Sequence, residues 1–494
     1  MTEIAQGAVS AVRETSLLIG GRPRRASGGA TFDRHDPFTG KVATRAAAAT
    51  PGDASAVVDT AAAAFPEWSA SLPRDRRAAM LRAADLLEDR AEQLVELMIS
   101  ETGATWKWAR HNIEKAKAIV LEAGAQVYNV TGEILPADMP NGFYMVTRAP
   151  CGVILSIAPW NAPLVLAARA LAFPLAFGNT VVLKASELCP ATHVALGEMF
   201  VDAGVLPGAV NVVTHAPADA PRVVETLIAH PAVRRINFTG STAVGRVVAE
   251  LAGRHLKRVL LELGGKNPLI VLADADLEYA AHAATFGAFA NSGQACMASN
   301  RILVEQAIAD ELIERVVARA EALPSGDPRS PDTVIGPLAN EQSLAKVQAL
   351  VDDAVEHGAR MLCGGMSHGL VYRPTVLVGI APEMRLYDEE VFGPIAPITV
   401  VDAVEDAVRI ANQTSFGLSA GILTSDIDRG FEIAAQIESG MAHVNNQTLH
   451  DEPHVPFGGV KDSGFGRFGG RYAIDEFTEL RWVTAQRVPR QFPF

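Results

Sequence analysis

The sequence predicts an α/β protein in which parallel sheets are covered by helices on both faces. Short apolar runs with strand character at 152–159 and 180–186 are separated by a helical segment. Further runs at 209–214 and 234–240 enclose another helical segment, and the same alternation resumes near residue 260. Apolar strands that alternate with helices are typical of parallel sheets buried on both faces. Such an architecture usually binds a nucleotide.

The length, composition and net charge of the chain are those of a globular protein, and they exclude some functions. A chain of 494 residues is too long for one hydrophobic core, so two or three domains are expected. With 49% apolar and 20% charged residues, the chain has enough apolar material for packed cores. The formal net charge of −13 argues against binding to nucleic acid, which normally needs clustered Lys and Arg.

The sequence gives no indication of export or membrane insertion. Its N-terminal stretch contains charged residues in place of an uninterrupted apolar run, and its most apolar segments are short or broken by Arg and Pro. The cysteines show neither metal spacing nor a disulfide framework. We therefore expect a cytoplasmic protein with reduced thiols and no bound metal. Three cysteines are expected to be structural or incidental: Cys151, Cys189 and Cys363.

Local patterns predict the individual elements. Residues 15–23 predict a strand that ends in a Gly-Gly turn. Apolar residues near a 3.6-residue period predict one long helix over 74–100 and another over 308–323. Extended segments at 143–150 and 478–486 would leave open strand edges, so we expect them to lie between subunits.

A candidate nucleophile lies in the segment NSGQACMASN at 291–300. Gly293 and Ala295 leave room for a ligand beside the sulfur of Cys296, and few apolar residues are available to pack around it. We therefore expect a lightly packed segment with an accessible sulfur. A nucleophilic cysteine also needs a lowered pKa or a nearby base. The alternative is an ordinary buried thiol.

Two further polar residues lie where predicted strands end. Glu262 stands between leucines in LELGGKNP, on a buried strand, where a carboxylate is costly unless it is paired or used for proton transfer. A structural ion pair is the alternative for Glu262. Asn161, in APWNAP, follows a strand and precedes a helix that begins with Pro. It fits either a helix cap or an amide donor directed at a developing oxyanion.

Three more motifs complete the pattern: FTGSTAVG at 238–245, EEVFGP at 389–394 and PFGGVKDSGFGR at 456–467. Together with the segments that contain the asparagine, the glutamate and the cysteine, they occur in the order found in the aldehyde dehydrogenase superfamily. The sequence resembles this superfamily over essentially its whole length.

The resemblance implies a chemical role for each of the three residues. Cys296 would attack the aldehyde carbon as a thiolate and give a thiohemiacetal. The amide of Asn161 and the backbone N–H of Cys296 would hold the oxyanion. Hydride transfer to a nicotinamide would leave a thioester, and Glu262 would activate the water that hydrolyses it to the acid.

The resemblance also assigns residues to a dinucleotide. FTGSTAVG replaces the usual Gly-x-Gly-x-x-Gly fingerprint, and its Gly240, Ser241 and Gly245 would place a helix N-terminus at the pyrophosphate. Lys184 and Glu187 match positions that hold the adenosine ribose. A carboxylate at Glu187 favours free ribose hydroxyls over a 2′-phosphate, so NAD is expected rather than NADP. A solvated pair of loops is the alternative.

The nicotinamide end is assigned in the same way. Glu390 and Phe392 match the pair that positions the nicotinamide ribose and ring. Trp160, directly before Asn161, is expected to pack beside the same channel.

The implied fold has three parts. A Rossmann-like NAD-binding domain would comprise residues 1–128 and 151–261, and a second α/β catalytic domain residues 262–470. A small β element for bridging and oligomerisation would be formed by residues 129–150 and 471–494. Members of the superfamily assemble as dimers or tetramers, so we expect a homodimer or homotetramer.

Softer similarities indicate an aromatic substrate. Stretches such as RRINFTGST and DEFTELRW are most similar to those of bacterial vanillin and salicylaldehyde dehydrogenases. Trp108 and Phe457 are expected to sandwich an aromatic ring, and the small Ala162 and Ala168 to widen the funnel. Arg169 is expected to hydrogen-bond a ring hydroxyl or neighbouring carbonyls. The alternatives place Trp108 in the core and Arg169 in a structural ion pair.

Three other functions stay open at this point. An aliphatic aldehyde or a semialdehyde would be oxidised by the same chemistry. A coenzyme-A-acylating enzyme is disfavoured, because Glu262 would direct water at the thioester. A catalytically silent structural or binding protein with this fold is the alternative from a different class, and the intact Cys296, Glu262 and Asn161 argue against it.

Overall fold

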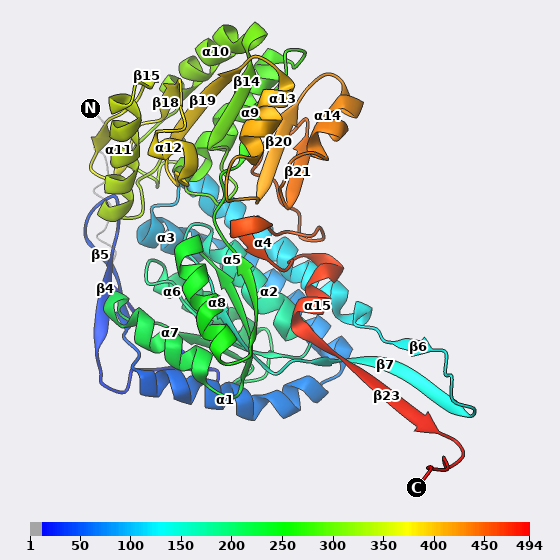
Figure 1. The fold of residues 1–494 in the computed structure, drawn as a ribbon. Coiled ribbons are helices and arrows are strands. Elements are labelled where there is room, and N and C mark those ends of the chain that lie inside the picture. Colours follow the sequence, from blue (N-terminus) through cyan, green and yellow to red (C-terminus); the bar gives the residue numbers. More distant parts are fainter. Residues whose placement is uncertain (1–11) are drawn as a thin grey trace.

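The computed structural model describes residues 12–494, which form two α/β parts and a projecting arm (Figure 1). The lower part in Figure 1 contains an eight-stranded sheet, and the upper part contains a seven-stranded sheet. A small three-stranded sheet near the N-terminus adds β1 (Arg13–Thr15), β4 (Thr31–His35) and β5 (Val42–Ala47). The predicted α/β fold class is confirmed.

The centre of the eight-stranded sheet consists of five parallel strands in the order β12-β11-β8-β9-β10. These strands are β8 (Val153–Ile157), β9 (Thr180–Lys184), β10 (Val210–Val213), β11 (Val233–Thr239) and β12 (Arg258–Glu262). The register pairs Ile157 with Lys184 and Thr239 with Glu262. Because the strands are parallel, their carboxyl ends meet at one edge of the sheet, where the predicted site residues also lie.

Helices cover both faces of this sheet, as the unbroken apolar strands predict. Successive residues of β8 point to opposite faces, so Ile154 packs into one core and Leu155 into the other. The first face is covered by α2 (Pro73–Asp89), α3 (Ala91–Thr102), α4 (Trp106–Gln126), α5 (Pro163–Ala176) and α6 (Pro190–Asp202). The second face is covered by α1 (Pro51–Ala70), α7 (Ala220–Ala229) and α8 (Thr242–Arg254).

The single long helix predicted over 74–100 is wrong, because the chain breaks at Arg90. Arg90 has φ −105° and ψ 16°, outside the helical range, and separates α2 from α3. Its guanidinium is held by Asp202 on α6 at 2.6 Å. Because the chain breaks here, α2 and α3 are two helices with different directions, and each of them packs against α4 and α6. The strand predicted over 15–23 with its Gly-Gly turn is confirmed as β2 (Leu17–Ile19), and across the two glycines it pairs with β3 (Arg22–Arg24) to form a hairpin.

The upper part has the same layered construction. Its strands run in the order β15-β18-β19-β14-β13-β20-β21, with every pair parallel except the one at the β15 edge. They are β13 (Pro268–Val271), β14 (Arg301–Glu305), β15 (Arg360–Cys363), β18 (Thr375–Val378), β19 (Ile395–Val401), β20 (Ser419–Leu423) and β21 (Met441–Val444). The covering helices are α9 (Leu277–Phe289), α10 (Ala309–Ala322), α11 (Glu341–Glu356), α12 (Arg385–Asp388), α13 (Val404–Asn412) and α14 (Ile427–Ala434).

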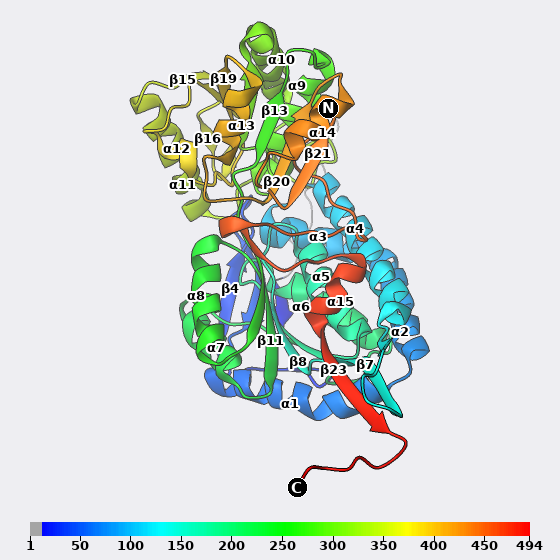
Figure 2. The same ribbon diagram turned by 45° about the vertical axis from the view of Figure 1, so that its right-hand side comes forward.

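After β21 the chain crosses back to the lower part, a path visible in Figure 2 as the orange-to-red segment between the two parts. There the short strand β22 (Gly464–Phe465) pairs antiparallel with β12, placing Gly464 opposite Glu262. The segment expected to form the second domain, 262–470, therefore contains one strand of the first sheet. This crossing places the glycine-rich loop 456–467 next to the side chain of Glu262.

The arm is a three-stranded antiparallel sheet of β6 (Glu133–Leu135), β7 (Gly142–Pro150) and β23 (Thr478–Gln486). Figure 1 shows it projecting away from both parts, with the C-terminal tail beyond it. Large apolar side chains on the arm are open to solvent in the single chain, among them Ile134, Leu480 and Trp482. The strands predicted at 143–150 and 478–486 are confirmed. None of the helices in the described part of the chain is long and apolar enough to span a bilayer.

Candidate active site

The predicted nucleophile, amide and carboxylate meet in one cavity of about 260 Å³ between the two parts. Asn161 follows β8, Glu262 ends β12, and Cys296 lies in the loop before β14. The cavity wall includes Trp160, Gly240, Ser241, Glu390 and Phe392 as well as the three residues. The sequence reasoning did not anticipate Leu166, Ser343 and Lys346, which also line it.

The segment around Cys296 is more tightly packed than predicted. Only Cys296 and Met297 are half-exposed, whereas their neighbours from 291 to 295 are buried. Gly293 has φ +69°, and a Cβ at this position would lie 2.0 Å from the carbonyl oxygen of Gly393. The expectation of light packing was therefore wrong, because the small residues permit backbone to approach backbone. They do not leave empty space.

A buried asparagine that the sequence reasoning missed fixes the Cys296 loop. The Nδ2 of Asn267 donates to the carbonyls of Cys296 at 2.8 Å and Ala298 at 2.9 Å. Its Oδ1 accepts a hydrogen bond from the backbone N–H of Ser419 at 3.1 Å. An asparagine directly after the Gly-Gly-Lys of LELGGKNP was the available signal, since a buried amide needs such partners.

Hydrogen bonds from neighbouring residues hold Asn161 in place, and it does not cap the following helix. The N-cap position of α5 is Ala162, and Asn161 donates from Nδ2 to the carbonyl of Gln294 at 3.1 Å. The backbone carbonyl of Asn161 accepts two hydrogen bonds, from Nε1 of Trp108 and from Nδ2 of Asn291, each at 2.9 Å. Trp108 therefore has a positioning role toward Asn161 that neither reading of the sequence included.

Burial keeps the resting thiol protonated. Burial, reinforced by the carboxylates of Glu262 and Glu390 and opposed by Arg169, raises the pKa of Cys296 to about 12. A nucleophilic role therefore depends on a base that takes the proton, since the pKa of the sulfur is not lowered.

Glu262 has the properties of such a base. Its side chain is 2% exposed, and Oε1 has no hydrogen-bond partner among residues 12–494. Burial raises its pKa well above the ordinary range, with Arg169 and Arg467 opposing the shift. A Cβ at Gly458 would lie 2.8 Å from Oε1, so the neighbouring loop accommodates the carboxyl group only with glycine there. The structural ion pair that was the alternative for Glu262 is not formed among residues 12–494, where Arg169 pairs with Asp451.

The structure favours the ion pair over the ring-hydroxyl contact for Arg169. The guanidinium is 6% exposed and bonded to Asp451, which the sequence reasoning missed. It also lies over the ring of Phe457, 4.2 Å from the ring centroid. Phe457 is 3% exposed beneath it, so contact with a substrate ring requires Arg169 to move. Ala168 is fully buried in the core and does not widen a funnel.

The N-terminus of α8 presents the predicted pyrophosphate site. Ser241 is the N-cap residue, and its hydroxyl accepts from the N–H of Val244. A Cβ at Gly240 would lie 2.6 Å from the ring of Phe238, and one at Gly245 would lie 2.5 Å from Leu263. Glycine at 245 therefore lets α8 pack closely on Leu263, and glycine at 240 leaves room for the ring of Phe238. The exposed helix end and the glycines fit a bound diphosphate.

The predicted ribose pair lies at the end of β9. Nζ of Lys184 is 3.4 Å from Oε2 of Glu187. Burial raises the pKa of Glu187, but the ammonium of Lys184 and backbone hydrogen bonding outweigh it, so the pKa lies below its ordinary value. Glu187 is therefore ionised at neutral pH and can accept hydrogen bonds from hydroxyl groups.

Lys184 and Glu187 do not line the cavity that contains Cys296, whereas the predicted nicotinamide residues do. The rings of Trp160 and Phe392 meet edge to face, with centroids 5.8 Å apart. Phe392 has φ +53°, a strained value for a bulky residue, and this places its ring in the cavity. Glu390 accepts from the N–H of Gly265 at 3.2 Å, and its backbone carbonyl is held by Lys346 at 2.7 Å. These side chains fit the ribose and ring of a nicotinamide nucleotide.

A nucleotide crevice that ends on a cysteine, an amide and a buried carboxylate defines an aldehyde-oxidising dehydrogenase. Comparison with known families agrees: residues 24–483 match the aldehyde dehydrogenase family. The chain belongs to this family, whose members use a nicotinamide cofactor.

Individual relatives are similar over nearly their whole length. The chain is 50% identical to a vanillin dehydrogenase of Pseudomonas fluorescens, over 97% of this chain and 99% of that protein. It is 42% identical to a salicylaldehyde dehydrogenase of Pseudomonas sp. strain C18, over 97% of this chain and all of that protein. Its fold matches a salicylaldehyde dehydrogenase of Pseudomonas putida G7, crystallised with salicylaldehyde, with a TM-score of 0.96 at 42% identity. That match covers 98% of this chain and 100% of the other.

Proposed function

We propose that the protein oxidises an aromatic aldehyde to its carboxylic acid with NAD. The supporting observation is the identity of 50% along the whole chain to a protein named for vanillin oxidation. The cavity that contains Cys296, Glu262 and Asn161 supports the chemistry.

In this mechanism the sulfur of Cys296 bonds to the carbonyl carbon of the aldehyde as its proton leaves. The unpartnered Oε1 of Glu262 is the acceptor available for that proton. The Nδ2 of Asn161 and the backbone N–H of Cys296 hold the oxygen as it becomes negative, a contribution of about 3–4 kcal/mol for one such donor. A bound nicotinamide supplies the acceptor for the hydride. Loss of the hydride leaves the acyl group on the sulfur of Cys296 as a thioester. Glu262 releases the first proton to solvent and then takes a proton from the water that hydrolyses the thioester. The carboxylic acid leaves, and the sulfur of Cys296 regains a proton.

The aldehyde preference is testable with a panel. We expect kcat/KM for vanillin, salicylaldehyde or benzaldehyde to exceed that for a short aliphatic aldehyde or succinate semialdehyde, because the relatives reported above are named for aromatic aldehydes. Formation of the reduced cofactor at 340 nm measures this, and each aldehyde is run with NAD and with NADP. A higher kcat/KM for the aliphatic compounds would refute the aromatic assignment and leave the dehydrogenase class intact.

The NAD preference is proposed to depend on Glu187. Changing Glu187 to Gln removes the charge that repels a 2′-phosphate, so the ratio of kcat/KM with NADP to that with NAD should rise about tenfold, equivalent to about 1.4 kcal/mol. Initial rates with both cofactors measure the ratio. The matched control is Glu198→Gln, a half-buried carboxylate on α6 outside the cavity. A ratio that stays unchanged in Glu187→Gln would contradict the assignment.

A further inference from the structure

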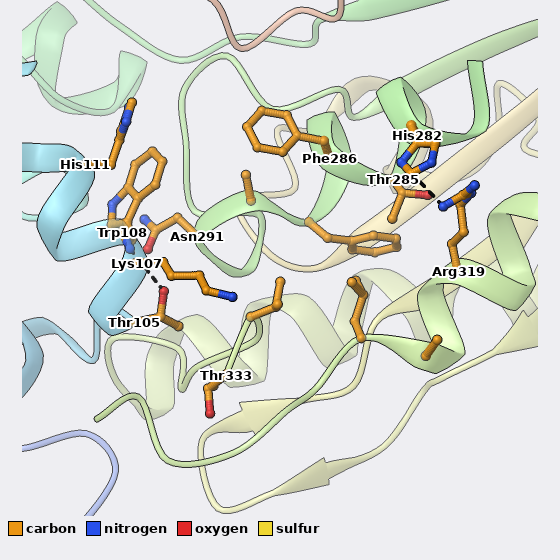
Figure 3. A pocket seen from close by; sticks show the side chains of 15 residues that line it. Thr105, Lys107, Trp108, His111, His282, Thr285, Phe286, Asn291, Arg319 and Thr333 are labelled. Carbon is orange, nitrogen blue, oxygen red and sulfur yellow. Dashed lines mark hydrogen bonds between the residues drawn. The ribbon is translucent and has the colours of Figure 1, made fainter. Parts of the chain in front are cut away.

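A second cavity lies beside the active site, between α4 and the α9–α10 pair (Figure 3). This α4–α9 cavity measures about 590 Å³ and is walled by Trp108, Phe286, Phe289, Leu323 and Val334. Neither Cys296 nor Glu262 lines it. Its size and its apolar wall suit a flat aromatic ring.

The titratable side chains of the α4–α9 cavity are basic, and its other polar residues are threonines and an asparagine. Lys107, His111, His282 and Arg319 line it, and no carboxylate does so in the described part of the chain. Arg319 is already bonded to Glu278, which also lies 3.5 Å from His282. By contrast, Lys107 forms no ion pair with any residue between 12 and 494, and Figure 3 shows its amino group extending into the cavity. A ligand of matching chemistry carries one negative charge next to an aromatic ring.

The wall of this cavity is connected to the active site through two hydrogen bonds. Trp108 and Asn291 both line the cavity, and both donate to the backbone carbonyl of Asn161. The side chain of Asn161 in turn lines the cavity that contains Cys296. A ligand that packs against the indole of Trp108 therefore contacts a group that positions Asn161.

We propose that the α4–α9 cavity binds an aromatic monocarboxylate, its ring against Trp108 and Phe286 and its carboxylate on Lys107. An aromatic monocarboxylate is also the product of the proposed reaction, and this identification rests on the proposed function. Occupancy alters the position of Asn161, so the acid lowers turnover from a site that the aldehyde does not occupy. The acid and the aldehyde therefore bind at the same time.

Binding of benzoate to the full-length enzyme tests the site directly. Isothermal titration calorimetry should give a Kd at least tenfold weaker for Lys107→Ala than for the unaltered protein. The matched control Lys117→Ala removes a lysine of the same helix that faces Glu88, and it should bind benzoate normally. Benzyl alcohol, which has the ring without the charge, should bind the unaltered protein more weakly than benzoate does.

Kinetics distinguish this site from the catalytic one. At saturating cofactor, benzoate should inhibit the unaltered enzyme without full competition against the aldehyde, and Lys107→Ala should lose that component. Strictly competitive inhibition, or benzoate binding that is indifferent to Lys107, would overturn the proposal. Failure of the aromatic assignment gives a different result: the enzyme would prefer aliphatic aldehydes and still bind benzoate through Lys107.

Discussion

Replacing Cys296 with Ala is expected to abolish formation of the reduced cofactor. The sulfur makes the covalent bond on which the proposed mechanism depends, and removal of a nucleophile from a comparable enzyme costs about six orders of magnitude in kcat. We therefore expect a fall in kcat of about four orders of magnitude or more. The measurement is the steady-state absorbance at 340 nm with saturating cofactor and aldehyde.

The control for this experiment is Cys363→Ala, which removes a half-buried thiol from the edge strand β15. Its activity should match that of the unaltered enzyme. Cofactor binding to Cys296→Ala should persist, because none of the residues assigned to the dinucleotide has changed. Turnover that survives in Cys296→Ala would refute the assignment of the nucleophile. If the unaltered protein showed no turnover with any aldehyde, the silent binding protein would be the correct function.

Changing Glu262 to Gln should slow both the first turnover and deacylation, because the proposed mechanism uses this carboxylate to take the thiol proton and later a proton from water. The amide cannot take a proton from water, and loss of a general base costs about 10²–10⁴-fold. Stopped-flow mixing should therefore show that the first turnover of reduced cofactor and the steady state that follows are each slower by about two orders of magnitude or more.

The pH dependence gives a second readout for Glu262. Burial raises the pKa of this carboxyl group well above its ordinary value, so the base form is gained as pH rises through that pKa. Deacylation in the unaltered enzyme should accelerate over that interval, and Glu262→Gln should lose the acceleration. The control is Glu198→Gln, a half-buried carboxylate on α6 whose pKa is also raised by burial and which lies outside the cavity. A first turnover in Glu262→Gln that keeps the rate of the unaltered enzyme would refute the role of Glu262 as acceptor of the thiol proton and leave it a role in deacylation alone.

Much of the site could be predicted because the ends of buried strands and the positions of glycines are easy to recognise in the sequence. Glu262 is preceded by an apolar run, and parallel strands deliver their carboxyl ends to one edge, so its meeting with Asn161 follows from the pattern. Gly245 signals the close approach of a helix to Leu263 in the same way. These features are local, since each depends on a few consecutive residues.

Features that depend on distant residues could not be predicted. Arg169 and Asp451 are separated by 282 positions, and only the return of the chain after β21 brings them together. The burial of the Cys296 loop likewise depends on Gly393 and on the anchor at Asn267, neither of which is marked by the run of small residues itself. The break at Arg90 interrupts an apolar period that continues on both sides, so periodicity alone cannot locate it.

The protonated state of Cys296 has a consequence for the durability of the protein. Peroxides and alkylating agents attack the anionic form of sulfur far faster than the neutral form. With a pKa of about 12, the sulfur is almost entirely neutral at physiological pH. We therefore expect oxidants and electrophiles to react slowly with Cys296 in the resting protein, and faster once its proton has been taken during turnover.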